Sequence, residues 1–164
     1  MNILLSGVVN DSIVDGNGIR FTVFTQGCPH NCPKCHNPQT HDPKGGYYED
    51  TENIIAMIAE NPLLDGVTLS GGEPFEQPVA CAVIAQQVKN MGLNVWAYTG
   101  YTWEQLLCKN DDNILKLLHF VDVLVDGRFV YELRSLDIRF RGSSNQRMID
   151  VQKSIAQNCV VLFE

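Results

Sequence analysis

The sequence predicts an α/β protein with a parallel sheet, and two patterns along the chain support this. Short β-branched or apolar runs alternate with helical patterns, which is typical of β–α units joined in a parallel sheet. Glycine-rich or polar motifs follow directly after these runs, where parallel strands bind ligands. A complete eightfold barrel needs about 200 residues or more. The 164 residues therefore predict a partial (β/α) barrel in a single compact domain, residues 1–164.

Turn and capping signals place the individual elements. The sequence IRFTVFT at residues 19–25 alternates and is β-branched or aromatic, so it predicts a strand. The two glycines of DGNGIR, at residues 15–20, favour a turn before it. The other expected strands are residues 1–14, 66–70, 94–98, 120–125, 138–140 and 160–163. Caps and prolines predict helices over residues 51–61, 78–91 and 151–157, and helical segments over residues 102–119.

Composition and charge narrow the functional class. The net charge of −7 argues against a general nucleic-acid binder. No apolar run approaches the ~20 residues that span a bilayer. The first residues contain neither a basic stretch nor a long apolar segment, so no signal peptide is expected. A soluble cytoplasmic protein that binds neither nucleic acid nor membrane is the expectation.

The sequence CPHNCPKCHN at residues 28–37 groups three cysteines, Cys28, Cys32 and Cys35, as C-x3-C-x2-C. Thiolates are soft ligands that suit iron–sulfur clusters or zinc, and a closed site of either kind takes four ligands. Three thiolates on a 4Fe-4S cluster leave one iron open to an exogenous molecule. A zinc knuckle completed by His30, His36 or His41 is the alternative.

The other three cysteines, Cys81, Cys108 and Cys159, lie among apolar or helix-forming neighbours, and each is expected to be a small core residue. A second motif, Gly71-Gly72-Glu73-Pro74, follows the strand expected at residues 66–70. Its glycines allow a ligand to approach the backbone, and Glu73 can accept a hydrogen bond from a cation. Alone, this motif could equally be a plain turn.

Together these motifs resemble a known family. C-x3-C-x2-C followed by His36, with GGEP downstream, resembles the radical S-adenosylmethionine superfamily. DGNGIR resembles the D-G-x-G-x-R motif of glycyl-radical activating enzymes. The sequences WAYTGY, VLVDGRF and RGSSNQR, starting at residues 96, 123 and 141, are similar to the activating proteins of anaerobic ribonucleoside-triphosphate reductases. The similarity covers residues 10–150.

The resemblance implies a fold and a reaction. The fold is a partial barrel of the radical S-adenosylmethionine type. Cys28, Cys32 and Cys35 hold a 4Fe-4S cluster whose open iron binds S-adenosylmethionine. One electron, from a flavodoxin-type or other low-potential donor, yields a 5′-deoxyadenosyl radical that abstracts hydrogen from a glycine of the reductase large subunit.

The resemblance also implies the cofactor-binding residues. His36 is expected near the adenine, and Asp126 and Arg128 near the cofactor carboxylate or the incoming glycine loop. The full expected set is Lys34, Cys35, His36, Gly71, Gly72, Glu73, Asp126 and Arg128. Tyr98 stands where the related formate-lyase activases carry an acidic residue, so the resemblance does not extend to a cation site there.

Other functions remain open at this point. One is a non-enzymatic zinc or electron-transfer module, although a simple iron–sulfur carrier supplies four thiolates and does not need GGEP. The others are an activase of another glycyl-radical enzyme, such as formate lyase, and a small radical enzyme acting on a free metabolite.

Five of the six arginines fall between Arg128 and Arg147. An acidic protein that docks an acidic partner needs a local basic patch. We therefore expect this segment to lie beside the open end of the partial barrel and to contact the reductase. The alternative is that these arginines are solvated or pair with Asp137 and Asp150.

Overall fold

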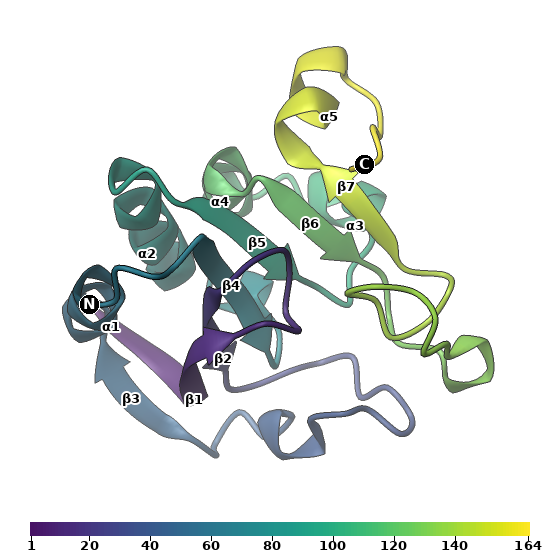
Figure 1. Cartoon of the computed structure of the whole chain (residues 1–164). Coiled ribbons are helices and arrows are strands. Elements are labelled where there is room, and N and C mark those ends of the chain that lie inside the picture. The colour runs from purple at the N-terminus through teal and green to yellow at the C-terminus, as the bar shows by residue number, and fades with distance from the viewer.

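The computed structural model describes residues 1–164 and places seven strands in one sheet (Figure 1). The strands are β1 (Asn2–Ser12), β2 (Arg20–Thr25), β3 (Tyr47–Asp50), β4 (Gly66–Gly71), β5 (Asn94–Tyr98), β6 (Val123–Asp126) and β7 (Arg147–Asp150). Their order is β3-β1-β2-β4-β5-β6-β7. The four central strands β2, β4, β5 and β6 run parallel, and the flanking pairs are antiparallel. The predicted α/β class with a parallel sheet is confirmed.

Side-chain caps begin several of the helices where the sequence predicts them. The helices are α1 (Thr51–Glu60), α2 (Pro78–Asn90), α3 (Trp103–Cys108), α4 (Asp112–Phe120) and α5 (Val151–Gln157). Asp50 accepts the Glu52 N–H at the start of α1, and Thr102 and Gln105 form a capping box at the start of α3. None of these helices combines the length and the apolar character that a membrane crossing requires.

The predictions fail mainly after β6. Residues 138–140 are not a strand, because Phe140 adopts the left-handed conformation with φ of 63°, which a strand excludes. The strand in this region is β7, which pairs antiparallel with β6. The strand expected at residues 120–125 begins only at Val123, because α4 continues through Phe120. The edge strand β3 is a further element that the sequence pattern missed.

The two faces of the sheet are covered differently. Helices α1, α2 and α4 pack on one face, and their apolar side chains form the main core with inward-facing strand residues such as Val95 and Leu124 (Figure 1). Side chains alternate along a strand, so Trp96, Val123 and Val125 point to the other face. There they meet loop residues, Phe140 among them. The loop-covered face is therefore where a ligand can reach the strand ends.

The C-terminal segment also packs on the loop-covered face. Phe163 donates its backbone N–H to the Met148 carbonyl at 2.9 Å, and Leu162 forms a single bridge with Ile149. The Phe163 ring lies 5.5 Å from the Trp96 ring, centroid to centroid, in an edge-on arrangement. The terminal strand predicted at residues 160–163 is thus reduced to one bridge, and an aromatic contact anchors it.

We predict that Phe163→Ala lowers the free energy of unfolding by about 1–2 kcal/mol, because a half-buried aromatic contact with Trp96 is lost. Urea denaturation of the cluster-free protein measures this. Leu162→Ala is the matched control, since Leu162 is 58% exposed and its loss should cost less than about 0.5 kcal/mol. Equal effects of the two changes would contradict the anchoring role.

Candidate functional site

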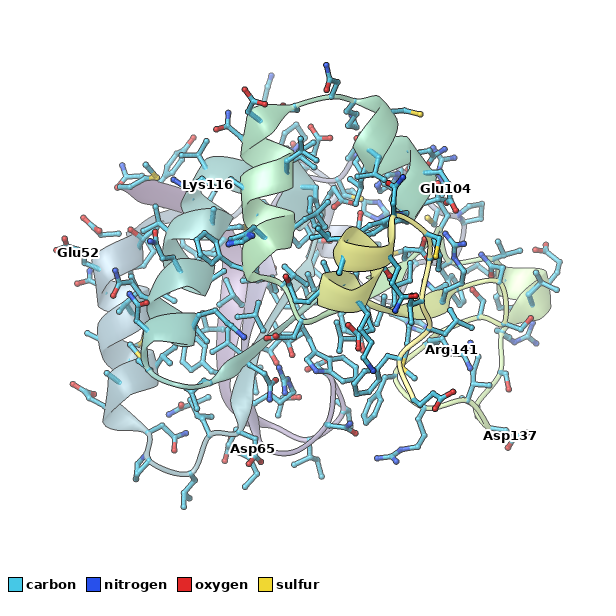
Figure 2. The ribbon with its side chains drawn as sticks, turned by 90° about the horizontal axis from the view of Figure 1, so that it is seen from above. Glu52, Asp65, Glu104, Lys116, Asp137 and Arg141 are labelled. Carbon is cyan, nitrogen blue, oxygen red and sulfur yellow. The ribbon has the colours of Figure 1, made fainter.

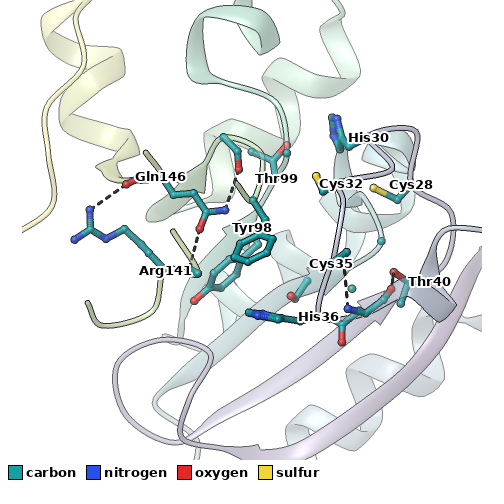
Figure 3. Close-up of a pocket in the computed structure, with 18 of the residues that line it drawn as sticks. Cys28, His30, Cys32, Cys35, His36, Thr40, Tyr98, Thr99, Arg141 and Gln146 are labelled. Carbon is teal, nitrogen blue, oxygen red and sulfur yellow. Dashed lines mark hydrogen bonds between the residues drawn. The ribbon is translucent and has the colours of Figure 1, made fainter. Parts of the chain in front are cut away.

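Loops that follow the four parallel strands surround one pocket of about 340 Å³ (Figure 3). The cysteine loop follows β2, the Gly71-Gly72 turn ends β4, Thr99 and Gly100 follow β5, and Gly127 follows β6. The carboxyl ends of parallel strands meet at one edge of a sheet, which is where open α/β sheets bind ligands. The predicted convergence of these motifs on one site is what the structure has.

Cys28, Cys32 and Cys35 all line this pocket as half-buried free thiols (Figure 3). Burial raises the pKa of the Cys28 and Cys32 thiols. The Asn37 N–H lies 3.4 Å from the Cys35 sulfur, within reach of a weak hydrogen bond. No three His, Cys, Asp or Glu side chains are arranged to hold a single metal ion. A 4Fe-4S cluster takes each thiolate on a different iron, so a set of pocket-lining thiolates suits a cluster.

The Gly71-Gly72 turn lies against the cysteine loop so closely that side chains are excluded. A Cβ on Gly71, whose φ is 92°, would come within 2.5 Å of the Thr25 nitrogen. A Cβ on Gly72 would come within 2.4 Å of the Gly27 carbonyl oxygen. Both glycines line the pocket and present bare backbone to it.

Glu73 lies behind this turn and does not line the pocket. Its side chain is fully buried, and its carboxylate accepts hydrogen bonds only from the protein. The donors are His30 Nε2, Thr99 Oγ1 and the backbone N–H groups of Phe75 and Gly100. The structure therefore places Glu73 immediately behind the wall of the site.

Three other predicted residues also lie outside the pocket lining. The buried Asp126 accepts the Trp103 N–H at 2.8 Å and two hydrogen bonds from Arg147. Arg128 is exposed. Its positive charge lowers the pKa of the Cys32 thiol, but burial raises that pKa by more. Lys34 extends over the Tyr131 ring, with Nζ 3.8 Å from the centroid. Of the expected cofactor set, Cys35, His36, Gly71 and Gly72 line the pocket.

Two aromatic residues for which the sequence predicts no role, Phe129 and Tyr98, also line the pocket. The Phe129 ring lies 4.9 Å from the His36 ring, centroid to centroid, so the two rings form a tilted pair at the cysteine loop. Tyr98 donates its hydroxyl to the Phe140 carbonyl at 2.7 Å, and burial raises its pKa. The one signal in the sequence that could have placed Phe129 at the pocket is its position directly after the VDGR sequence.

Polar residues complete the wall. Gln146 accepts the Gly142 N–H through Oε1 at 2.8 Å and donates Nε2 to the Gly127 carbonyl at 3.0 Å, which ties the loop before β7 to the end of β6 (Figure 3). The same loop contributes Arg141, whose guanidinium donates to the Gln146 carbonyl. Asp15 is the only carboxylate among the lining residues. The DGNGIR and RGSSNQR motifs were the available signals for these positions.

The cysteines outside the loop are not all core residues. Cys81 is fully buried in α2, as predicted, and burial raises its pKa to about 12. Cys108 and Cys159 are exposed, so the prediction is wrong for both. Cys108 ends α3 and Cys159 follows α5, where the chain faces outward.

The comparisons with known proteins agree with this site. Residues 14–149 match the family model described as a 4Fe-4S single cluster domain. Relatives at 37% identity in Vibrio cholerae and 33% in Escherichia coli (strain K12) are each named anaerobic ribonucleoside-triphosphate reductase-activating protein. The alignments cover 82% of this chain and 89% and 90% of those two chains. The chain belongs to the family of anaerobic ribonucleoside-triphosphate reductase-activating proteins.

Other comparisons differ in strength. The activating protein of Enterobacteria phage T4 is 30% identical over 82% of this chain and 86% of its own length. Among solved structures, QueE from Escherichia coli aligns with a TM-score of 0.48 at 16% identity, over 62% of this chain and 54% of that one. That likeness is too weak to identify the fold.

Family membership decides between the two hypotheses for the cysteine loop, a 4Fe-4S cluster and a zinc knuckle. The matched family carries a 4Fe-4S cluster rather than zinc. In addition, His30 Nε2 lies 2.6 Å from Glu73 Oε2, so this nitrogen forms a hydrogen bond within the protein and is not free to bind a metal ion. The zinc knuckle is therefore disfavoured.

We predict that alanine at Cys28, Cys32 or Cys35 abolishes the 4Fe-4S signal after anaerobic reconstitution, because two thiolates do not hold a cubane with one open iron. Absorbance and electron paramagnetic resonance, with iron and sulfide analysis, measure this. Cys108→Ala and Cys159→Ala are the controls, since both thiols are exposed and lie outside the pocket lining. A cluster that survives in Cys32→Ala but not in Cys108→Ala would refute the ligand assignment.

Proposed function

We propose that this chain activates an anaerobic ribonucleoside-triphosphate reductase through radical S-adenosylmethionine chemistry. The observation that carries the proposal is the pocket in which three cysteines face the bare Gly71-Gly72 turn. The names of the relatives, which cover most of this chain, supply the target. We include in the proposal that the open sheet is the partial barrel of the radical S-adenosylmethionine type, with β2, β4, β5 and β6 as its parallel part.

Each part of the pocket has a task in this proposal. Cys28, Cys32 and Cys35, whose thiols line the pocket, would hold a 4Fe-4S cluster, and its fourth iron would have no cysteine ligand. The backbone of Gly71 and Gly72 would take the methionyl end of S-adenosylmethionine, since both residues line the pocket and neither carries a side chain that could cover the backbone. The His36 and Phe129 rings offer an apolar surface for the adenine.

When bound, the cluster and S-adenosylmethionine supply the one-electron chemistry that produces a 5′-deoxyadenosyl radical and, from it, a glycyl radical on the reductase. The protein contributes placement, electronics and exclusion of water. Gln146 holds the loop that forms one wall, and the Tyr98 hydroxyl holds Phe140 of the same loop. The electron comes from a flavodoxin-type or other low-potential donor.

The direct test combines the reconstituted protein with S-adenosylmethionine, a reductant and the anaerobic reductase of the same organism. We expect a glycyl-radical signal on the reductase by electron paramagnetic resonance. A reductase whose radical-bearing glycine is replaced by alanine is the matched control. Cleavage of S-adenosylmethionine without any radical on the reductase would show that the target is a different protein.

Two of the five clustered arginines are half-buried and form contacts within the protein, which leaves three exposed arginines to contact a partner. Arg147 pairs with the buried Asp126 and with Glu104, and Arg141 holds the Gln146 carbonyl. The exposed arginines are Arg128, Arg134 and Arg139, which we name the arginine patch, and none of them forms an ion pair with an acidic residue. We propose that the arginine patch contacts an acidic surface of the reductase.

We predict that Arg134→Glu with Arg139→Glu slows radical transfer to the reductase, most strongly at low ionic strength, because surface charges are less screened there. Cleavage of S-adenosylmethionine under dithionite should persist. The control is Lys116→Glu with Lys153→Glu, which reverses two exposed charges; Lys116 lies on the opposite side of the molecule from Asp137 and Arg141 (Figure 2). Wild-type activation rates in the arginine variant across ionic strengths would exclude the patch as the docking surface.

A further inference from the structure

A buried side-chain pair joins the cysteine loop to the turn after β4. His30 lies between Cys28 and Cys32 in the chain, and its Nε2 is 2.6 Å from Glu73 Oε2. The side chains are 4% and 0% exposed. A buried polar contact of this kind is costly to disrupt, because either partner would be left without a hydrogen bond.

The Glu73 carboxylate has no acceptor capacity left for a ligand. Oε1 accepts the Phe75 N–H at 3.1 Å and the Thr99 hydroxyl at 2.9 Å. Oε2 receives His30 and the Gly100 N–H, at 2.6 and 2.8 Å, and is 3.0 Å from the same Thr99 hydroxyl. The carboxylate thus ties together the cysteine loop, the end of β4 and the end of β5.

The His30 ring is fixed by packing as well as by this hydrogen bond. The Tyr101 ring meets it edge-on at 4.5 Å between centroids. A Cβ on Gly100 would come within 2.3 Å of the His30 ring, so a glycine is needed for the ring to fit. Two backbone hydrogen bonds join the same two segments. The Gly72 N–H donates to the Thr25 carbonyl at 2.7 Å, and the Glu73 N–H donates to the Gly27 carbonyl at 2.9 Å.

We propose that His30 and Glu73 are positioning residues that set the spacing between the cysteine loop and the Gly71-Gly72 turn, and thereby the affinity for S-adenosylmethionine. His30 lines the pocket with a side chain only 4% exposed, and Glu73 lies behind the wall. The inference rests on the proposed function, in which S-adenosylmethionine spans from the open iron to that turn. A ligand that bridges two loops binds tightly only when both are held at the right separation. Glu73 therefore affects ligand binding indirectly, because its hydrogen bonds hold His30, Thr99 and Gly100 in place.

Three variants test this. His30→Phe keeps a ring against Tyr101 and loses the hydrogen-bond donor, whereas His30→Gln keeps a donor. Glu73→Gln removes the charge. In protein with wild-type iron and sulfide content, calorimetry should show S-adenosylmethionine affinity lowered by roughly 10- to 100-fold in His30→Phe and Glu73→Gln. His30→Gln should restore much of it. The double variant His30→Phe/Glu73→Gln should be no worse than Glu73→Gln alone, because Glu73→Gln already breaks the contact with His30.

A second readout is the change that S-adenosylmethionine causes in the electron paramagnetic resonance of the reduced cluster, which should need higher ligand concentrations in His30→Phe. His119→Phe, at an exposed position of α4, is the matched control. Wild-type affinity in His30→Phe would overturn the proposal, and if Glu73→Gln alone lost affinity, Glu73 would be a direct ligand. Loss of the cluster in both His30→Phe and Glu73→Gln would also overturn it, because the pair would then maintain the cysteine loop itself.

The binding measurements use no reductase. Wild-type protein that binds S-adenosylmethionine but leaves the reductase inactive would refute the proposed target, while the variants would still decide the positioning role.

Discussion

The parallel pairing of β2 with β4 determines where the chemistry of this protein can lie. Their register sets Thr25 opposite Gly71, so the cysteine loop and the Gly71-Gly72 turn leave the sheet side by side. At that point the two backbones approach so closely that neither Gly71 nor Gly72 can carry a Cβ. The thiolates, the bare turn and the pocket between them all depend on this one approach.

The same strand pair explains the DGNGIR motif. Arg20 is fully buried at the start of β2 and donates to the Thr68 hydroxyl, the Val67 carbonyl and the Asn17 carbonyl. Burial lowers its pKa to about 10, so the guanidinium remains charged at neutral pH. A Cβ on Gly16 would come within 2.8 Å of the Arg20 side chain. The arginine thus ties the turn to β4 through the Asn17 carbonyl and Thr68, and the Thr68 hydroxyl in turn donates to the carbonyl of Asp15, which lines the pocket.

Features set by local chemistry could be predicted from the sequence. The cap at Asp50, the capping box at Thr102 and the strand at residues 94–98 depend on neighbouring residues, and they lie where expected. The three cysteines and the two glycines of the turn could be predicted to line one site, because each motif directly follows a strand of the parallel sheet.

Features set by contacts between distant segments could not be predicted. Glu73 looks like a ligand in isolation, but its partners His30 and Thr99 lie 43 and 26 residues away. Asp126 is likewise taken by Arg147, across the β6–β7 pair. Phe140 gives no sign in the sequence of its left-handed backbone, which removes one predicted strand and leaves β7 as the partner of β6.

We propose that the cysteine loop and the Gly71-Gly72 turn bind one ligand together. Electron–nuclear double resonance on the reduced cluster, with S-adenosylmethionine carrying ¹⁵N at its amino group, measures whether they do. We expect a hyperfine coupling between the cluster and this nitrogen, and its loss in Gly72→Ala, where a Cβ would clash with the Gly27 carbonyl. Binding of S-adenosylmethionine without such coupling, or an unchanged coupling in Gly72→Ala, would refute joint binding by the loop and the turn.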